Sequence, residues 1–185
     1  MSGRRWRSRT YRASVAVVLI LVGVVFAVTG IPYLVASGEA RRPELEEHVV
    51  KLTLPPGVAL ESLQKARVYD IVDGDTIHVV IEPRLLTIRY YGVDTPERGD
   101  KCYREAQDRN MALVGKEVLL LEDARDEDRF GRTLRYVFLP DGTSLDATLV
   151  AEGFGRAWRQ DGLYKDQIMA LQAEAEAGGR GCLWK

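Results

Sequence analysis

Residues 66–92, ARVYDIVDGDTIHVVIEPRLLTIRYYG, contain three runs of β-forming residues separated by short polar turns. The runs cover residues 66–72, 76–81 and 85–92, and valine, isoleucine and tyrosine are frequent in them. Two later runs of the same kind cover residues 116–121 and 133–139. The sequence therefore predicts five main β-strands.

Helical patterns lie between and after these strands. Residues 103–114 place apolar residues on one helical face, and residues 164–177 form an alanine-rich stretch that ends at two glycines. A further helix-like stretch follows the Asp141-Gly142 turn and runs to Val150, and a short strand is expected near residues 156–159. Elements in this order predict an α+β fold, a five-stranded OB-type β-barrel with about three packed α-helices.

The N-terminal region has the pattern of a segment that inserts into a membrane. Residues 1–13 are basic, with five arginines and no acidic residue among the first twelve, and residues 13–38 carry no charged side chain. A helix over residues 14–35 is long enough to cross a hydrocarbon core of about 30 Å. The preceding arginines predict that the N-terminus stays inside the cell and that the C-terminal domain is exported.

Two interpretations of this segment stay open. Its uninterrupted length favours a retained single-pass anchor at the cell membrane. A cleaved signal sequence fits the apolar core at residues 15–28 and the small residues that follow it. The adjacent Arg4 and Arg5 are also compatible with a twin-arginine signal. Either interpretation places the rest of the chain outside the cytoplasm, attached to the membrane or secreted.

The remaining chain divides by composition into two parts. Residues 36–65 mix charges with prolines and are predicted to be a linker, and residues 66–185 are predicted to form one globular domain. Within the linker, residues 48–54 (HVVKLTL) alternate as a short strand does.

The charge balance limits how this protein can bind an anionic polymer. The whole chain has a net charge of −1, from 26 basic and 27 acidic residues, and the N-terminal arginines account for five of the basic ones. The remainder therefore has 21 basic and 27 acidic residues. A protein that binds nucleic acid through a broad basic surface has the opposite balance. Binding of a phosphodiester here must depend on a few arginines and a metal ion.

Three short polar clusters are the candidates for chemistry. They cover residues 73–76 (DGDT), 89–97 (RYYGVDTPE) and 128–132 (DRFGR). Each cluster alone is typical of an ordinary turn or a solvated loop. The clusters become informative together, because loops at one end of a barrel can form a single site.

The acidic residues of these clusters suit a hard metal ion. Calcium takes oxygen ligands from carboxylates, backbone carbonyls and water. Asp75 and Asp94 lie on two different loops and can offer two carboxylates, and the carbonyl of Thr95 lies beside the second.

The remaining charged residues of the clusters suit chemistry at a phosphate. Arg89 and Arg132 can donate forked hydrogen bonds to phosphate oxygens, for which arginine is better suited than lysine. Glu97 can orient or deprotonate a water molecule for attack on phosphorus.

These motifs resemble the thermonuclease (staphylococcal nuclease-like) family, over about residues 66–184. The matching positions are Asp73-Gly74-Asp75-Thr76, Arg89, Gly92-Val93-Asp94-Thr95-Pro96-Glu97, Asp128 and Gly131-Arg132, with Gly181-Cys182-Leu183-Trp184 near the end. The resemblance implies an OB-fold barrel with packed helices. It also implies a calcium-dependent phosphodiesterase, a nuclease that acts on DNA and RNA.

Six residues match the family's metal-binding and catalytic positions. The implied calcium ligands are Asp75, Asp94 and, through its backbone carbonyl, Thr95; the implied catalytic residues are Arg89, Glu97 and Arg132. Glu97 matches the general base or water-positioning residue, and the two arginines match those that stabilise the transition state at phosphorus. Phe130 departs from the family, which often has tyrosine there, and Trp158 is either a core residue or a base-stacking platform.

Cysteine usage and the alternatives in function complete the expectations. Cys102 and Cys182 can form a disulfide in an exported protein, or can stay as two free thiols. A non-catalytic OB-type module, held at the membrane and binding nucleic acid or protein, is the main alternative to a nuclease. An envelope protein with a role in assembly is a weaker one. No protein partner is predicted.

Overall fold

The computed structural model describes residues 48–185. The predicted basic segment at residues 1–13, the predicted membrane or signal helix at residues 14–35 and the first part of the predicted linker lie outside the described residues. Among residues 48–185, no helix has both the length and the apolar character needed to cross a membrane.

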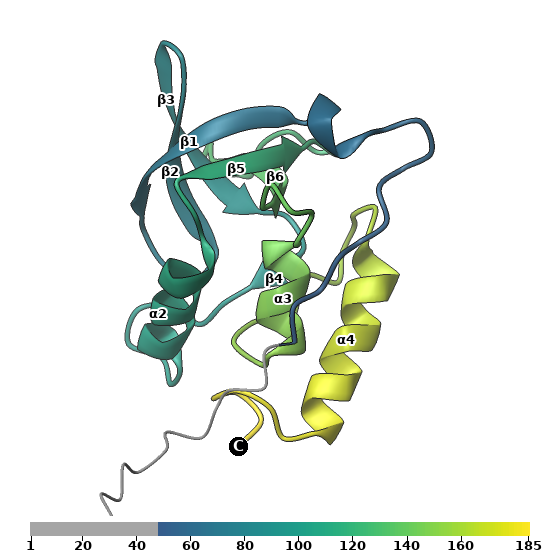
Figure 1. Cartoon of the computed structure of the whole chain (residues 1–185). Coiled ribbons are helices and arrows are strands. Elements are labelled where there is room, and N and C mark those ends of the chain that lie inside the picture. The colour runs from purple at the N-terminus through teal and green to yellow at the C-terminus, as the bar shows by residue number, and fades with distance from the viewer. Residues whose placement is uncertain (1–47) are drawn as a thin grey trace, which may run out of the picture. The chain divides into compact units, whose positions relative to one another are not determined.

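A closed five-stranded β-barrel forms one half of the described domain (Figure 1). Its strands are β1 (Gln64–Ile71), β2 (Thr76–Ile81), β3 (Arg84–Tyr90), β5 (Glu117–Leu121) and β6 (Thr133–Phe138). Around the barrel the order is β1-β2-β3-β6-β5, and all neighbours are antiparallel except β3 and β6. The predicted five-stranded barrel is confirmed.

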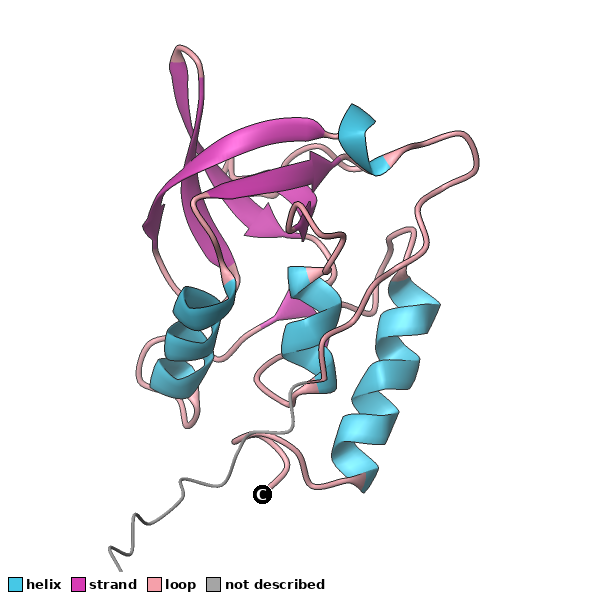
Figure 2. Ribbon diagram, viewed as in Figure 1, coloured by secondary structure: helices cyan, strands magenta, loops and turns pink. Residues whose placement is uncertain are grey.

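Three α-helices pack at one end of this barrel (Figure 2). They are α2 (Tyr103–Leu113), α3 (Leu145–Ala151) and α4 (Lys165–Ala177). A 3-10 turn, η1 (Leu60–Ser62), precedes the barrel, and a two-stranded sheet joins β4 (Val93–Asp94) to β7 (Arg156–Ala157). The predicted α+β plan with three helices is confirmed.

Helix α3 lies at the centre of the packing, between α2 and α4 (Figure 1). All seven of its residues are buried. So short a helix is marginal by itself, and burial on every side is what stabilises it. In the barrel, the strand register places Ile77, Val79, Ile88 and Val137 on one face, and all four are fully buried. Tyr136 and Phe138 lie on the opposite face of β6 and contact Tyr164, the residue before α4. Alternation along the strands therefore predicts the inner face of the barrel correctly.

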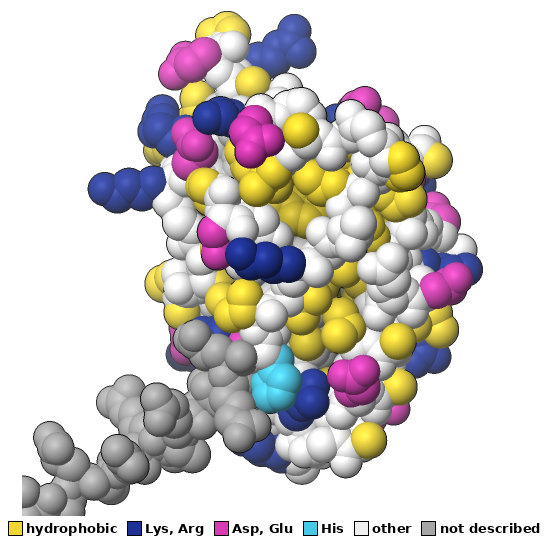
Figure 3. Space-filling view, turned by 45° about the vertical axis from the view of Figure 1, so that its right-hand side comes forward, with side chains coloured by type: hydrophobic (Ala, Val, Ile, Leu, Met, Phe, Trp, Pro, Cys, Tyr) yellow, Lys and Arg dark blue, Asp and Glu magenta, His cyan; other side chains and the backbone are white. Residues whose placement is uncertain are grey.

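The prediction of a strand at residues 48–54 is wrong. This segment is extended but belongs to no strand. The Val50 N–H donates to the Thr148 hydroxyl at 3.1 Å, and the Ser144 N–H donates to the Val50 carbonyl at 2.8 Å. A closed barrel has no free edge for a sixth strand, so the segment bonds to the start of α3 instead. Figure 3 shows hydrophobic side chains gathered in the middle of one face of the molecule.

A buried carboxylate on α3 joins the ends of two barrel strands. The two Asp146 oxygens accept hydrogen bonds from the backbone N–H groups of Gly92, at 2.7 Å, and Val137, at 2.9 Å. Burial raises the pKa of Asp146 to about 6, although both N–H groups act in the opposite direction. A Cβ at Gly92 would lie 2.5 Å from the terminal methyl of Ile168 and 3.0 Å from the Tyr136 ring, so a larger residue would require these side chains to move.

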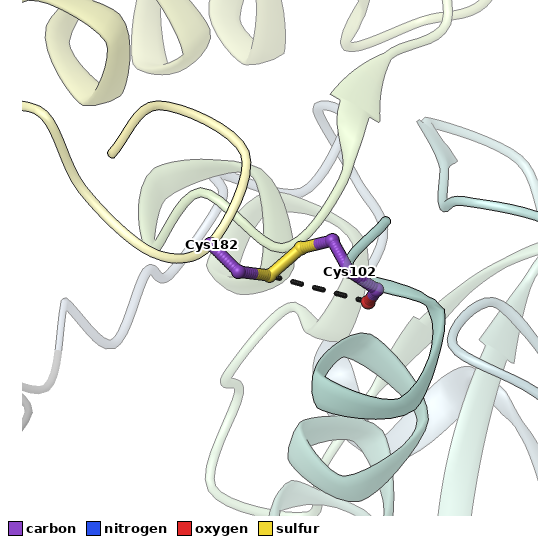
Figure 4. The surroundings of a disulfide bond; sticks show 2 residues. All are labelled: Cys102 and Cys182. Atoms are coloured by element: carbon purple, nitrogen blue, oxygen red, sulfur yellow. Dashed lines mark hydrogen bonds between the residues drawn. A yellow bond between two sulfur atoms is a disulfide. The ribbon is translucent and has the colours of Figure 1, made fainter. Parts of the chain in front are cut away.

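A disulfide between Cys102 and Cys182 confirms the predicted pairing (Figure 4). The two Cα atoms are 5.6 Å apart, within the usual range for such a bond. Cys102 is the residue before α2 and has a φ of +80°, the left-handed region. The bond therefore joins the C-terminal tail to the segment that follows Glu97.

Asp146 predicts a specific pH dependence of stability. The pKa of Asp146 in the folded protein is raised from 3.8 to about 6. The contribution of Asp146 to stability is therefore fully present below pH 3.8 and is lost as the pH rises through about 6. The free energy of unfolding of the wild type, relative to Asp146→Asn, should fall by roughly 3 kcal/mol from about pH 4 to about pH 7. Urea unfolding of both proteins across this range measures the change. A difference between them that does not vary with pH would contradict the assignment.

Candidate functional site

The turn between β1 and β2 is built by Asp73. Its carboxylate accepts a hydrogen bond from the Asp75 N–H at 3.1 Å, and the Val72 and Asp73 N–H groups both donate to the Thr76 carbonyl. Short-range bonds from an aspartate to the backbone two residues later are a common way to stabilise a turn. As a result, the Asp75 side chain is buried, with the residue only 4% exposed.

Helix α2 holds this turn from outside. The Gln107 side-chain amide donates to the Val72 carbonyl at 2.8 Å, and the Asn110 amide donates to the Asp73 carbonyl at 2.9 Å. Asn110 is fully buried and also accepts a hydrogen bond from the Tyr90 hydroxyl. Sequence reasoning missed both residues. The available signal is that Asn110 lies four residues after the buried Ala106, where an amphipathic helix normally carries an apolar side chain.

The Asp75 carboxylate connects the first polar cluster to the second. One oxygen accepts hydrogen bonds from the Thr95 N–H at 2.7 Å and the Thr95 hydroxyl at 2.8 Å. The other accepts from the Thr76 hydroxyl and lies 3.0 Å from Arg89 Nε. Thr95 is buried, and its N–H and hydroxyl hold the two loops together.

Gly74 permits this contact between the loops. A Cβ at position 74 would lie 2.7–2.9 Å from three side-chain atoms of Thr95. The glycine of the first cluster is therefore required for space rather than for an unusual φ angle.

Arg89 lies between the two acidic loops. Its guanidinium contacts Asp75 at 3.0 Å and Asp94 at 2.8 Å, and also donates to the Tyr90 and Val93 carbonyls. The residue is 8% exposed, so these bonds form in a largely water-free environment. Three of the five guanidinium N–H groups donate hydrogen bonds, and Nε forms an ion pair with Asp75. In this structure Arg89 binds both carboxylates that the sequence identifies as metal ligands.

Asp94 and Glu97 point into more open surroundings. The Asp94 side chain is 55% exposed, although its backbone pairs with Arg156 in the β4–β7 sheet. Glu97 is exposed, and within residues 48–185 its carboxylate has no hydrogen bond or ion pair. Both side chains line the same cleft.

Asp128 orients Arg132. One Asp128 oxygen accepts from the N–H groups of Phe130 and Arg132, and the other from Arg132 Nε at 2.7 Å. Burial raises the pKa of Asp128, but the hydrogen bonds from Arg132 and Phe130 lower it more, so it lies below its ordinary value. Arg132 Nη1 lies 3.5 Å from the Thr76 hydroxyl, which leaves its terminal nitrogens largely available to a ligand.

The second and third clusters meet at one open cleft, and the first cluster is joined to it through the contact of Asp75 with Arg89. Its lining residues are Arg89, Asp94, Glu97, Arg125, Asp128, Arg129, Phe130, Arg132, Trp158 and Gln160. Four arginines therefore face three carboxylates, although the domain as a whole is acidic. Among the six predicted site residues, four line the cleft, and Asp75 and Thr95 are buried behind Arg89. Sequence reasoning missed Arg125 and Gln160, and it assigned no role to Arg129 within the third cluster.

The carboxylates at this cleft and behind it are oxygen donors of the kind that a hard cation binds. Asp75 and Asp94 bring oxygens to within 3.0 Å and 2.8 Å of one guanidinium, so the two carboxylates converge on a common positive charge. All the candidate donors are oxygens, which suits calcium or magnesium better than zinc. Within the described part of the chain, no group of three or more acidic, histidine or cysteine side chains is arranged to hold a metal. An ion here would need backbone carbonyl and water oxygens as well.

Comparison with known proteins gives the family. Residues 87–185, more than half of the chain, match the family described as staphylococcal nuclease homologue. The chain belongs to this family. The resemblance predicted from the polar clusters is thus confirmed, and the matched region includes Arg89, Asp94, Glu97 and Arg132.

Several curated relatives share this region. The chain is 38% identical over 117 residues to endonuclease YncB of Bacillus subtilis (strain 168). This match covers 57% of this chain and 55% of YncB. It is 36% identical over 120 residues to an uncharacterized endonuclease of Escherichia coli O157:H7, and the match covers 64% of this chain and 75% of that protein. It is 33% identical over 129 residues to the thermonuclease of Staphylococcus hyicus, and the match covers 65% of this chain and 76% of that protein. The chain thus spans only about half the length of YncB.

The close contact at Gly74 gives a stability prediction. In Gly74→Ala the new methyl group must displace Thr95, which weakens its two bonds to Asp75, and we expect a loss of about 1–3 kcal/mol in the free energy of unfolding. Gly115→Ala is the matched control, since its Cβ would meet only the Glu117 carbonyl at 3.8 Å. Denaturant unfolding measures both variants. Equal stability of the two would show that the loops do not depend on this contact.

Proposed function

We propose that this protein is a calcium-dependent nuclease that hydrolyses phosphodiester bonds within DNA or RNA. The observation that carries the proposal is the convergence of Asp75 and Asp94 on Arg89, beside a cleft that Glu97 and Arg132 also line. The names of the relatives, which include endonucleases and a thermonuclease, support the same reaction class.

Glu97 is the proposed general base. Its carboxylate is exposed at the cleft and has no partner among the described residues, so it is available to accept a proton from an attacking water. Residues that already share hydrogen bonds, such as Asp128 and Asp75, are less suited to this role. Activity should therefore rise at alkaline pH, because the attacking water must lose a proton, and an acid optimum would count against this role.

Arg132 and Arg89 are the proposed stabilisers of charge at phosphorus. Attack builds negative charge on the equatorial oxygens, and arginines already in position stabilise it without reorganisation. Arg132 keeps its terminal nitrogens largely available. Arg89 has one N–H beyond those bound to Asp75, Asp94 and the two carbonyls, so its contact with phosphate is the smaller of the two.

Asp75, Asp94 and the Thr95 carbonyl would hold the calcium ion. When bound, calcium supplies positive charge next to the phosphate and makes a nearby water more acidic. The chain's part is to hold the two carboxylates close together, which Arg89 and Thr95 do.

The non-catalytic alternative is an OB-type binding module held at the membrane. It accounts for the barrel, but it requires neither an unpaired Glu97 in the cleft nor an oriented Arg132 beside it. An assembly role in the envelope leaves the same residues unexplained.

The proposed location is outside the cytoplasm. Residues 14–35 would serve as a single-pass membrane anchor, or would be removed as a signal sequence. The Cys102–Cys182 disulfide supports export, because such bonds persist mainly in oxidising compartments.

Hydrolysis of single-stranded DNA tests the function. The full-length chain in mild detergent should cut it with calcium and lose activity with a chelator, and Glu97→Gln should lower kcat by roughly 100-fold or more. Arg89→Ala should also lower activity. Glu117→Gln, an exposed residue of β5 outside the cleft, is the matched control. Calcium binding by the wild type and by Asp94→Asn, measured by calorimetry, gives a readout apart from activity. Equal rates with calcium and chelator, or no hydrolysis at all, would reject the proposal.

Asp128 predicts a loss of catalysis without a loss of the fold. Asp128→Asn keeps an oxygen for the two N–H groups but removes the charged partner of Arg132, so kcat should fall by roughly tenfold. Asp141→Asn is the matched control, because Asp141 accepts an N–H in another turn, from Thr143, and does not line the cleft. Steady-state kinetics on single-stranded DNA compare the two. If both variants retain the wild-type kcat, Asp128 does not orient a catalytic arginine.

A further inference from the structure

The segment that carries Glu97 is held at its two ends and not in between. We call residues 95–102 the Glu97 loop. Residues 97–101 are all exposed, and within residues 48–185 none of their side chains makes a hydrogen bond or an ion pair. A backbone bond from the Asp100 N–H to the Glu97 carbonyl, at 2.9 Å, closes a turn within the loop. The position of Glu97 therefore depends on the anchors at Thr95 and Cys102.

The first anchor, at Thr95, belongs to the barrel side of the site. The Thr95 N–H and hydroxyl donate to the Asp75 carboxylate at 2.7 Å and 2.8 Å, and Thr95 is buried. No cysteine takes part in these bonds, so this anchor does not depend on the oxidation state of the protein.

The second anchor, at Cys102, depends on the disulfide. Cys102 directly precedes α2, where a side chain that accepts a hydrogen bond from the first turn is preferred, and it makes no such bond in the described structure. Its φ of +80° lies in the left-handed region, which a residue with a side chain keeps only where the surroundings hold it. The covalent bond to Cys182 supplies this constraint (Figure 4).

The other end of the disulfide lies on a firmly packed part of the chain. Arg180 Nη1 donates to the Ala151 carbonyl at 3.1 Å, which bonds the C-terminal tail to the end of α3. A Cβ at Gly181 would overlap the Gly153 carbonyl, so the tail approaches this backbone as closely as only glycine permits. The disulfide from Cys182 therefore ties the Glu97 loop to the central helix of the domain.

Loss of the disulfide would act locally. Two hydrogen bonds of 2.6 Å from Arg109 to the Glu152 carboxylate hold α2 to the end of α3, and they do not involve the cysteines. The two proposed calcium carboxylates are likewise held by Arg89 and Thr95. The Glu97 loop and the first turn of α2 are thus the parts that depend on the bond.

We propose that the Cys102–Cys182 disulfide positions Glu97 for catalysis, so that the protein is an active nuclease only in its oxidised form. Cys102 and Cys182 are positioning residues, because neither is among the residues that line the cleft. A dithiol reductant transfers two electrons and two protons to the bond, which gives two thiols and leaves the reductant as a cyclic disulfide. Cys102 can then leave the left-handed conformation, and Glu97 loses its fixed place at the cleft.

This dependence on oxidation has a consequence in the cell. Thiols are kept reduced in the cytoplasm and form disulfides in oxidising compartments. The chain would therefore gain activity only after export, when its substrate is no longer the nucleic acid of its own cell. The inference rests on the proposed nuclease function for its effect on activity, but not for the effect of the disulfide on the loop.

Kinetics on single-stranded DNA test the proposal. The full-length chain in mild detergent with calcium should lose kcat roughly tenfold on reduction with dithiothreitol, because a misplaced catalytic group is ineffective. KM and calcium affinity, the latter from calorimetry, should change little. Cys102→Ser/Cys182→Ser should have the low kcat without reductant and no response to it. Val118→Ala is the matched control for lost stability, since Val118 is fully buried in β5, and it should keep the wild-type kcat.

The same reduction in Glu97→Gln shows whether the disulfide acts through Glu97. Two changes that affect one interaction are not additive. Reduction should therefore lower the kcat of the wild type roughly tenfold and that of Glu97→Gln by about twofold or less. An equal loss in both proteins would overturn the proposal, because the disulfide would then act on the fold as a whole or on another residue.

Hydrogen exchange of the full-length chain, read by mass spectrometry, separates this inference from the nuclease function. The Ala106 N–H donates to the Cys102 carbonyl at 3.0 Å and reports on the first turn of α2. Exchange in residues 97–106 should become roughly tenfold faster on reduction, and exchange in β2 should not change. Faster exchange without hydrolysis in either form would reject the nuclease and keep the role of the disulfide in the loop. Unchanged exchange, or equal hydrolysis in both forms, would overturn the inference and leave the nuclease in place.

Discussion

The ion pairs of Arg89 with Asp75 and Asp94 are the interaction on which the site depends. Two carboxylates this close repel one another, and burial of Asp75 makes its charge costly unless it is paired and hydrogen-bonded. The Arg89 guanidinium offsets both the repulsion and the cost of burial, because it lies 3.0 Å from the Asp75 carboxylate and 2.8 Å from the Asp94 carboxylate. The same bonds tie the β1–β2 turn to the loop after β3, which fixes the position of Thr95 and the path of the chain to Glu97.

The distribution of charge explains how an acidic domain would bind the polyanionic substrate that we propose. Outside the cleft, acidic residues are in excess and would repel a nucleic acid at long range. Inside the cleft, four arginines face three carboxylates, and Asp128 and Asp161 each orient an arginine instead of leaving it mobile. Attraction is therefore short-ranged and directional.

Much of the fold and part of the site follow from local sequence. Alternation of apolar residues predicts the barrel strands because burial on one face of a strand requires it, as at Ile77 and Val79. The residues of the three clusters were identifiable because each cluster is contiguous. Asn110 and Arg125 were not, since their partners lie 37 and 36 positions away and no local pattern links them. Residues 48–54 were misjudged for a related reason, because alternation cannot tell whether a strand edge is available.

The sequence by itself determined the strands, the helices, the family and the chemical nature of the candidate ligands, because these depend on local periodicity and on residue type. Only the tertiary structure decided which groups meet. It placed Arg89 between the two aspartates, left Glu97 at the cleft without a partner among residues 48–185, and used Asp161 to hold both Arg125 and Trp158. The physical reason is that hydrogen bonds and ion pairs act only over a few ångströms. Closure of the barrel and packing of the helices bring these distant residues within that range.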